Sequence, residues 1–280
     1  CTRLLQSIDN SRLDKTTGGQ MKLQYLGDAR DAFKWDVLYW LCSHSDESFN
    51  GLFFIPLLTP DDSSRDGRTH PKTFSTRNHQ ILEFLKILRE KKPRDLSRLT
   101  QLGQLMSIRE FPVEIHPVGG DPHTVIDRGE ERASYWQGLS LEKYRNYVIF
   151  LDPDNGIQTK TQDGTKWVLY GEMKCLLERL SDDSLVLVYQ HRPRSLSWEK
   201  ALPDVQQRLG KFAGHDSQAD CFLAIYTGQV ALVALAKNPE VGARVRKLWK
   251  EYIVAIVAKP EAEGTTTKVS KPPKLRLWPE

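Results

Sequence analysis

The stretch 147–156 constrains the fold of this chain more than any other. It reads Tyr-Val-Ile-Phe-Leu-Asp-Pro-Asp-Asn-Gly, an unbroken apolar run that stops at a turn carrying two carboxylates and a carboxamide. A continuous apolar run with β-branched residues is typical of a strand covered on both faces, as in a parallel sheet. Open α/β sheets bind ligands beyond the carboxyl ends of their strands, so Asp152 is a candidate to contact a substrate or cofactor. Asp154 and Asn155 join it as candidates, although Pro-Asp-Asn-Gly is also an ordinary turn sequence.

Other apolar runs alternate with segments of helical periodicity, which indicates an α/β fold. Buried strands are predicted at 51–58, 112–117, 147–151 and 184–189, with a β-hairpin at 221–235. Helices are predicted at 28–42, 73–91, 94–106, 127–144, 167–180, 197–212 and 239–250, and a separate apolar run follows at 252–257. We therefore expect a doubly wound, mostly parallel sheet, with the hairpin at one edge and a helical insertion between the first two strands.

The length and composition fit one domain. The chain has 280 residues, and the strand–helix alternation favours one large unit over two small ones. We assign that domain to 21–258, a poorly ordered extension to 1–20, and a flexible tail rich in Pro, Thr and Lys to 259–280. The 40 Lys and Arg against 36 Asp and Glu give a net charge of +4, which allows a nucleic-acid partner without requiring one.

Cysteine usage and hydropathy predict a soluble, cytoplasmic protein. The four cysteines are scattered and form no Cys-x-x-Cys pair, which argues against a structural zinc site and a disulfide framework. No apolar run is long enough to span a bilayer, and 1–20 lacks the apolar core of a signal peptide. We expect no membrane partner and assign no metal ligands.

Three charged residues lie at three-residue intervals where the first helix is predicted to begin. Asp28 is the expected N-cap, and Asp31 and Lys34 follow it. This spacing places them along one flank of the first turns. From the pattern alone, the simplest interpretation is a solvated helix face with an ion pair.

Three segments and the late hairpin together resemble one enzyme family. The segment 26–35, Leu-Gly-Asp-Ala-Arg-Asp-Ala-Phe-Lys-Trp, is similar to the family's Ala-Gly-Asn-x-Ala-Asp-x-x-Lys-His. The segment 114–117, Glu-Ile-His-Pro, is similar to its Glu-Leu-His-Pro, and Asp152-Pro153 aligns with the start of its Asp-Pro-Pro-Tyr. The family comprises the Rossmann-like, S-adenosylmethionine-dependent methyltransferases that modify an adenine N6 in large-subunit ribosomal RNA.

The resemblance implies a methyltransferase-like protein that acts on RNA or DNA, and it implies roles for particular residues. Glu114 would accept hydrogen bonds from the ribose hydroxyls of S-adenosylmethionine. His116, Lys34 and Asp28 would also lie at the cofactor. Asp152 would accept a hydrogen bond from the target amine of a base taken out of its stack.

The chain departs from the family at two places. Asn155 replaces the aromatic residue that stacks on the flipped base, and Asn cannot stack in this way. Thr-Pro-Asp-Asp at 59–62 replaces the glycine-rich loop that lets a cofactor approach the backbone closely. These departures leave a second interpretation open, in which a non-catalytic Rossmann-like domain binds a nucleotide or a partner.

A third interpretation is a Mg²⁺-dependent nuclease. Asp154, followed at a loop's distance by Glu172 and Lys174, satisfies the loose Pro-Asp…Glu-x-Lys pattern, in which carboxylates hold the metal and Lys assists the attacking water. That chemistry needs Glu172 and Lys174 on a strand. The apolar residues around them have helical spacing, which predicts a solvated helix face instead.

The strand at 184–189 leads into Gln190-His191-Arg192-Pro193-Arg194, at the same sheet edge as Asp152. His191 is a candidate general base or phosphate contact. Arg192 and Arg194 suit phosphate positioning, which gives affinity without sequence readout. Ordinary surface polarity is the other interpretation of these three residues.

Overall fold

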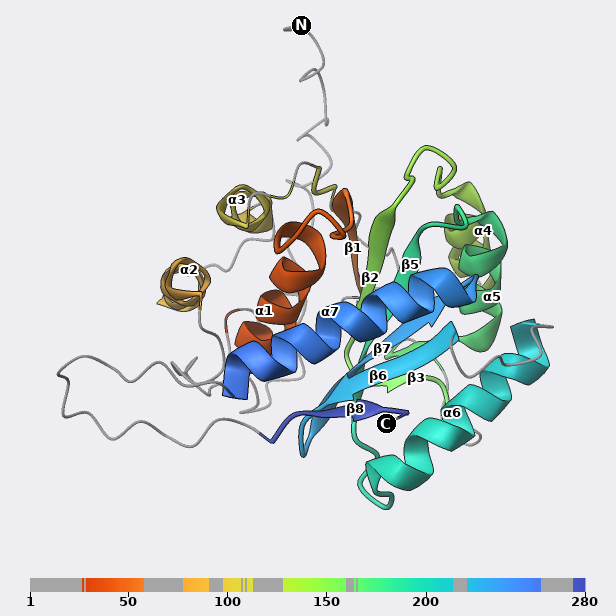
Figure 1. The fold of residues 1–280 in the computed structure, drawn as a ribbon. Helices are drawn as coiled ribbons and strands as arrows, with labels where there is room; N and C mark the ends of the chain where they lie inside the picture. Colours follow the sequence, from red (N-terminus) through yellow and green to blue (C-terminus); the bar gives the residue numbers. More distant parts are fainter. Residues whose placement is uncertain are drawn as a thin grey trace, which may run out of the picture.

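A six-stranded mixed β-sheet crosses the molecule and carries helices on both faces (Figure 1). This computed structural model describes Gly27 and residues 29–57, 78–90, 98–106, 108, 110–112, 128–159, 164, 166–213, 221–257 and 274–279. The strands, in sheet order, are β1 (Gly51–Leu57), β2 (Tyr147–Pro153), β5 (Leu185–His191), β7 (Val230–Ala236), β6 (Phe222–Tyr226) and β8 (Arg276–Trp278).

The sheet is parallel on one side and antiparallel on the other. Strands β1, β2 and β5 are parallel neighbours, whereas β7, β6 and β8 join through antiparallel pairs. Four of the six strands, β1, β2, β5 and β6, therefore run in the same direction. A short parallel pair, β3 (Gly156–Ile157) and β4 (Trp167–Val168), follows β2.

Two layers of helices bury the two faces of the sheet (Figure 1). One layer contains α1 (Ala29–Ser43), α2 (His79–Glu90), α3 (Leu99–Leu105) and α7 (Pro239–Val257). The other contains α4 (Arg128–Gly138), α5 (Tyr170–Arg179) and α6 (Trp198–Ala213). Because alternate residues of a strand face opposite layers, a strand covered on both faces needs apolar side chains throughout. Phe54 and Phe150 pack under α1, while Ile55 and Leu151 pack in the other layer.

The strands predicted at 51–58, 147–151, 184–189 and 221–235 are confirmed, apart from shifts of a few residues at their ends. The predicted separation of 239–250 from 252–257 is wrong, because α7 continues to Val257. Its continuity has a simple cause: Val245, Trp249, Tyr252 and Ile256 recur at helical spacing and are all buried in one cluster.

The predicted tail differs at its end. Within 259–280, Arg276–Trp278 forms β8, which pairs antiparallel with β6. Leu277 is buried there, and Trp278 packs edge-on against Phe222. The hairpin formed by β6 and β7 is therefore not at the sheet edge, because β8 covers it.

Strand β1 has later segments of the chain on both of its sides, so the order in which strands are added to the sheet reverses there. The backbone N–H groups of Leu52 and Phe54 donate to the carbonyl oxygens of Glu110 and Pro112, at 3.1 and 2.9 Å. Residues 110–112 thus run beside β1 on one side, and the chain returns on the other side as β2. Open α/β sheets bind ligands beyond the strand ends at such a switch point, and β2 ends there at Asp152 and Pro153.

Most of the strand predicted at 112–117, with Glu114 and His116, lies outside the described residues, as does Asp28. Among the helices that the structure does describe, none combines the length and the apolar character needed to cross a bilayer.

Candidate functional site

An ion-paired cluster joins the first turns of α1 to the carboxyl end of β2. Lys34 Nζ lies 2.7 Å from Asp152 Oδ2, although the two residues are 118 positions apart. The same ammonium lies 2.7 Å from Asp31 Oδ1, and the other oxygen of Asp31 accepts the Gly27 N–H at 2.6 Å. Lys34 and Asp31 are only 5 % and 3 % exposed. The solvated helix face predicted for them is therefore wrong, because this flank of α1 packs onto the strand ends.

Strand β5, the neighbour of β2, places an aromatic ring beside this cluster. Side chains alternate along β5, so Leu185, Leu187 and Tyr189 face the α1 layer. Lys34 Nζ sits over the Tyr189 ring, 4.6 Å from its centroid. A ring face attracts a cation, so this contact helps to fix the ammonium in position.

Burial and the neighbouring charges set the protonation of the cluster. Burial alone would lower the pKa of Lys34, but Asp152 and Asp31 outweigh it and raise that pKa above its usual value. Burial also raises the pKa of the Asp152 carboxyl; Lys34 opposes this shift, while Asp31 and Asp154 add to it. Asp152 and Asp31 thus both lie within ion-pair distance of the Lys34 ammonium. Asp152 keeps 19 % of its side chain exposed, so it can meet a ligand.

The turn after β2 is tied to the end of β5 through backbone bonds. Asn155 donates its N–H to the Lys166 carbonyl at 3.0 Å, and its own carbonyl accepts the His191 N–H at 3.2 Å. The Ile157 N–H donates to Gln190 Oε1 at 2.7 Å. Gly156 has φ = +121°, and a Cβ there would lie 2.5 Å from the Gln190 amide. The turn therefore requires glycine, and the backbone of Asn155 has a structural role.

His191 lies at the same edge as a neutral imidazole. Burial, followed by the nearby charges of Arg30 and Lys34, lowers the pKa of His191 to about 4, with Asp154 opposing the shift. The ring also packs edge-on against Tyr189, with centroids 5.0 Å apart. The imidazole is therefore uncharged at neutral pH, which disfavours the predicted role as a cationic phosphate contact.

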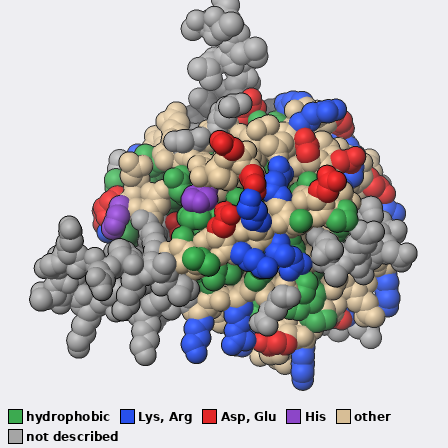
Figure 2. Space-filling view, viewed as in Figure 1, with side chains coloured by type: hydrophobic (Ala, Val, Ile, Leu, Met, Phe, Trp, Pro, Cys, Tyr) green, Lys and Arg blue, Asp and Glu red, His purple; other side chains and the backbone are tan. Residues whose placement is uncertain are grey.

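The basic residues after β5 are on the surface. Arg192 and Arg194 are exposed, and the backbone N–H of Arg192 donates to the backbone carbonyl of Gln229 at 2.8 Å. Figure 2 shows acidic and basic side chains interspersed over the face viewed there. Asp154 is mostly buried and pairs at 3.6 Å with Lys166, which is more exposed.

No protein-family model matches this chain, and no curated protein is significantly similar to it. The function therefore has to be inferred from the chemistry of the site.

The structure brings together four of the predicted site residues, Lys34, Asp152, Asp154 and His191. Asn155 belongs to the same turn. Asp28, Glu114 and His116 lie outside the described residues. Sequence reasoning missed Tyr189, whose signal was its place two residues before His191 on a strand that ends at the site.

Glu172 belongs to a different cluster, in the α4–α6 layer. It lies on α5, as the helical spacing predicted, but it is buried instead of solvated. The Arg132 guanidinium donates to both of its oxygens, Trp136 Nε1 donates to Oε1 at 2.6 Å, and the Leu169 N–H donates to Oε2 at 2.7 Å. Lys174 forms an exposed ion pair with Glu178 on the surface of α5.

This arrangement disfavours the nuclease interpretation, because Glu172 has no oxygen directed to a metal shared with Asp154. The described residues also contain no group of three or more His, Cys, Asp or Glu side chains arranged to hold a metal ion.

Proposed function

We propose that this chain is a methyltransferase-like protein that uses S-adenosylmethionine to modify a nucleic-acid base, with Asp152 at the reacting group. The observation that carries the proposal is the contact between Lys34 and Asp152. These residues come from two of the segments that resemble the adenine-N6 methyltransferases, and they meet at the strand end where such sheets bind ligands.

The charge of the site fits the proposed cofactor. S-adenosylmethionine supplies a methyl group on a cationic sulfonium, and the partly exposed Asp152 carboxylate would lie near that cation. Lys34 would hold its place through the two carboxylates, while Glu114, His116 and Asp28 would contact the cofactor as the resemblance implies. Asp31 belongs to this set through its ion pair with Lys34.

The remaining oxygen of Asp152 suits the proposed acceptor role. Lys34 engages Oδ2, and within the described residues no hydrogen bond engages Oδ1. An amine that donates to Oδ1 would be oriented by a carboxylate already fixed in place. Arg192 and Arg194, exposed beyond the same sheet edge, would contact phosphates of the polymer.

A second candidate is a non-catalytic domain that binds a nucleotide or a partner. It is favoured by Asn155, which stands where a stacking aromatic residue would be and whose backbone ties the turn to Lys166 and His191. The turn is thus rigid, but it presents no ring to a base.

Labelled methyl transfer to total RNA and total DNA, together with calorimetric titration of S-adenosylmethionine, separates these candidates. We expect transfer by the wild type and a loss of at least 100-fold in Asp152→Asn, because the group acts mainly in the transition state. Cofactor binding should be retained and unfolding should stay cooperative, because Asp31 still pairs with Lys34 in this variant. Asp182→Asn, an exposed carboxylate of a surface pair with Lys237, is the matched control and should transfer normally.

Cofactor binding without transfer to either polymer would favour the non-catalytic candidate. The absence of cofactor binding would remove the methyltransferase proposal. Cleavage that a chelator abolishes would instead establish the nuclease.

A further inference from the structure

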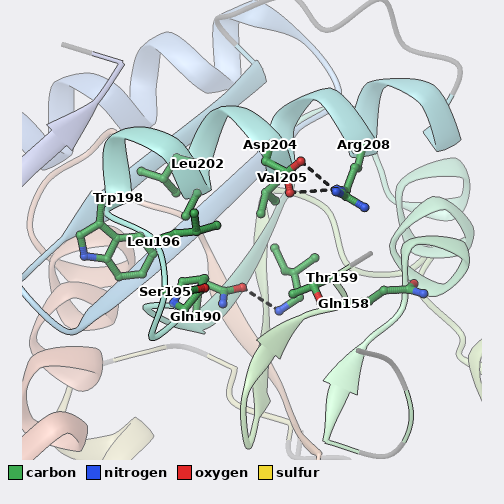
Figure 3. Close-up of a pocket in the computed structure, with 13 residues that line it drawn as sticks. Gln158, Thr159, Gln190, Ser195, Leu196, Trp198, Leu202, Asp204, Val205 and Arg208 are labelled. Carbon is green, nitrogen blue, oxygen red and sulfur yellow. Dashed lines mark hydrogen bonds and ion pairs between the residues drawn. The ribbon is translucent and has the colours of Figure 1, made fainter. Parts of the chain in front are cut away.

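A pocket of about 270 Å³ lies between α6 and the segment that follows β3 (Figure 3). Gln190 lines it, together with Val205 and Thr159. Along β5, Val186 and Val188 face the α4–α6 layer, and Gln190 continues that alternation. The pocket is therefore on the opposite side of the sheet from Tyr189 and the Lys34–Asp152 pair.

The inner part of the pocket is apolar and fixed. Ile157, Leu202 and Trp198 line it and are all buried. Trp198 Nε1 donates to the Thr227 carbonyl at 2.7 Å, which holds the indole in one orientation. Leu196 also lines the pocket and is 38 % exposed, so an apolar side chain stands on its solvent side. Apolar walls that include a fixed aromatic side chain suit a flat ring.

Two polar groups on the wall are already oriented. Gln158 Oε1 accepts the Tyr170 N–H at 2.9 Å, so the amino end of this amide is the one left to donate. Arg208 donates to both oxygens of Asp204, at 2.9 Å each (Figure 3). An ionised carboxylate has about four acceptor sites, so Asp204 can still accept hydrogen bonds after these two. A carboxylate held in place in this way suits the hydroxyls of a ribose.

We propose that this pocket binds a nucleoside, with the base against Leu196 and the partly exposed Val205, over the buried Trp198, and the ribose at Asp204. Gln158 would donate to an acceptor on the edge of the base. The volume lies below the range of roughly 300–1,000 Å³ typical of pockets for drug-sized ligands, which favours one nucleoside over a dinucleotide. The nucleoside is either a free molecule or one unit of a polymer. The site lies apart from Asp152, so it does not depend on methyl transfer.

Calorimetric titration with adenosine, guanosine, cytidine and uridine tests this site. We expect saturable binding of at least one nucleoside, weakened at least tenfold in Asp204→Asn, because the ribose loses a charged acceptor. Val205→Phe should weaken it similarly by filling the pocket without touching the ion pair, which covers the case in which Asp204→Asn fails to fold. Glu199→Gln, an exposed acid on the first turn of the same helix, is the matched control and should bind like the wild type.

The same variants, titrated with a short single-stranded RNA, identify the source of the nucleoside. RNA binding weakened by Val205→Phe assigns the pocket to one unit of a polymer, and unchanged RNA binding with lost nucleoside binding assigns it to a free nucleoside. Asp152→Asn should retain nucleoside binding even though it loses transfer, so the two proposals fail independently. No saturable binding to the wild type, equal binding to Asp204→Asn and Val205→Phe, or loss in Asp152→Asn would each overturn this assignment.

Discussion

Two buried charged clusters lie in the two helical layers, and they differ in how their charges are matched. Around Glu172, one carboxylate meets one guanidinium, and donors from Arg132, Trp136 and the Leu169 backbone occupy both oxygens. Around Lys34, two carboxylates share one ammonium. The Glu172 side chain is 7 % exposed, against 19 % for Asp152.

The difference separates a cluster that holds the fold from one that can do chemistry. A matched, closed pair has no capacity left for a ligand, and breaking it leaves an uncompensated charge in the interior. The open cluster has the pKa of its Asp152 carboxyl shifted by burial and by like charges, which is typical of functional sites. Stability should therefore depend most on the first cluster, and ligand binding on the second.

The largest effect on stability is expected for Glu172→Ala. It leaves the Arg132 guanidinium buried without its carboxylate, which should cost about 3–5 kcal/mol of unfolding free energy. Denaturant unfolding measures it. Glu178→Ala, an exposed acid on the same helix, should change stability by no more than about 0.5 kcal/mol. A loss below about 1 kcal/mol for Glu172→Ala would mean that the closed cluster does not hold α4 and α5 together.

Lys34→Met should destabilise the protein less, by about 2–3 kcal/mol, because Asp152 is partly exposed and can take up a proton. Adding Asp31→Asn should recover part of this loss, since it removes the repulsion that Lys34→Met leaves between two carboxylates. The same unfolding experiment on the two single variants and the double variant gives the coupling. Strictly additive losses would show that Lys34 and Asp31 are not coupled.

His191 gives the open cluster a pH dependence. Its pKa is about 4 in the folded protein against 6.5 for the ordinary side chain, so the unfolded chain binds the proton first. Its contribution to stability is therefore complete above about pH 6.5 and is lost as the pH falls toward 4. The raised pKa of Asp152 has the opposite effect, because it makes the folded protein more stable as the pH falls. A comparison of variants is therefore needed to isolate the contribution of His191.

We expect the unfolding free energy of the wild type to fall more steeply between pH 6.5 and 4 than that of His191→Asn. The exposed His79→Asn should follow the wild type. Parallel curves for the wild type and His191→Asn would show that the imidazole is not buried among these charges.

The sequence predicts the sheet well, because strands covered on both faces leave unbroken apolar runs such as 51–57 and 147–151. It misses β8, since a three-residue strand at the end of a segment rich in Pro and Lys has no periodicity of its own. The sequence also predicts 252–257 as separate from α7, because the helical spacing of Tyr252 and Ile256 cannot be recognised within a continuous apolar run.

The candidate site is predicted only in part, for a related reason. Strand ends point to Asp152 and His191, because the carboxyl edge of a parallel sheet is a known place for ligands. Helical spacing predicts that Asp31 and Lys34 are neighbours, but it does not predict that their side chains face the sheet. Glu172 is taken for a solvated residue because its partner, Arg132, is 40 positions away on another helix.

The smallest effect is expected where the open cluster meets solvent, at the 3.6 Å pair between Lys166 and Asp154. Lys166→Gln should change the unfolding free energy by no more than about 0.5 kcal/mol, because the Lys166 ammonium is largely solvated and lies 3.6 Å from Asp154. It should strengthen the binding of S-adenosylmethionine about twofold at low ionic strength, because it makes the site more acidic toward a cation. High salt should remove the gain by screening an exposed charge.

Lys174→Gln, which breaks the exposed pair with Glu178 on α5, should leave cofactor affinity unchanged. Weaker binding in Lys166→Gln at low salt would show that the proposed cofactor does not place its cation near Asp154, and the distinction between the two clusters would then rest on exposure alone.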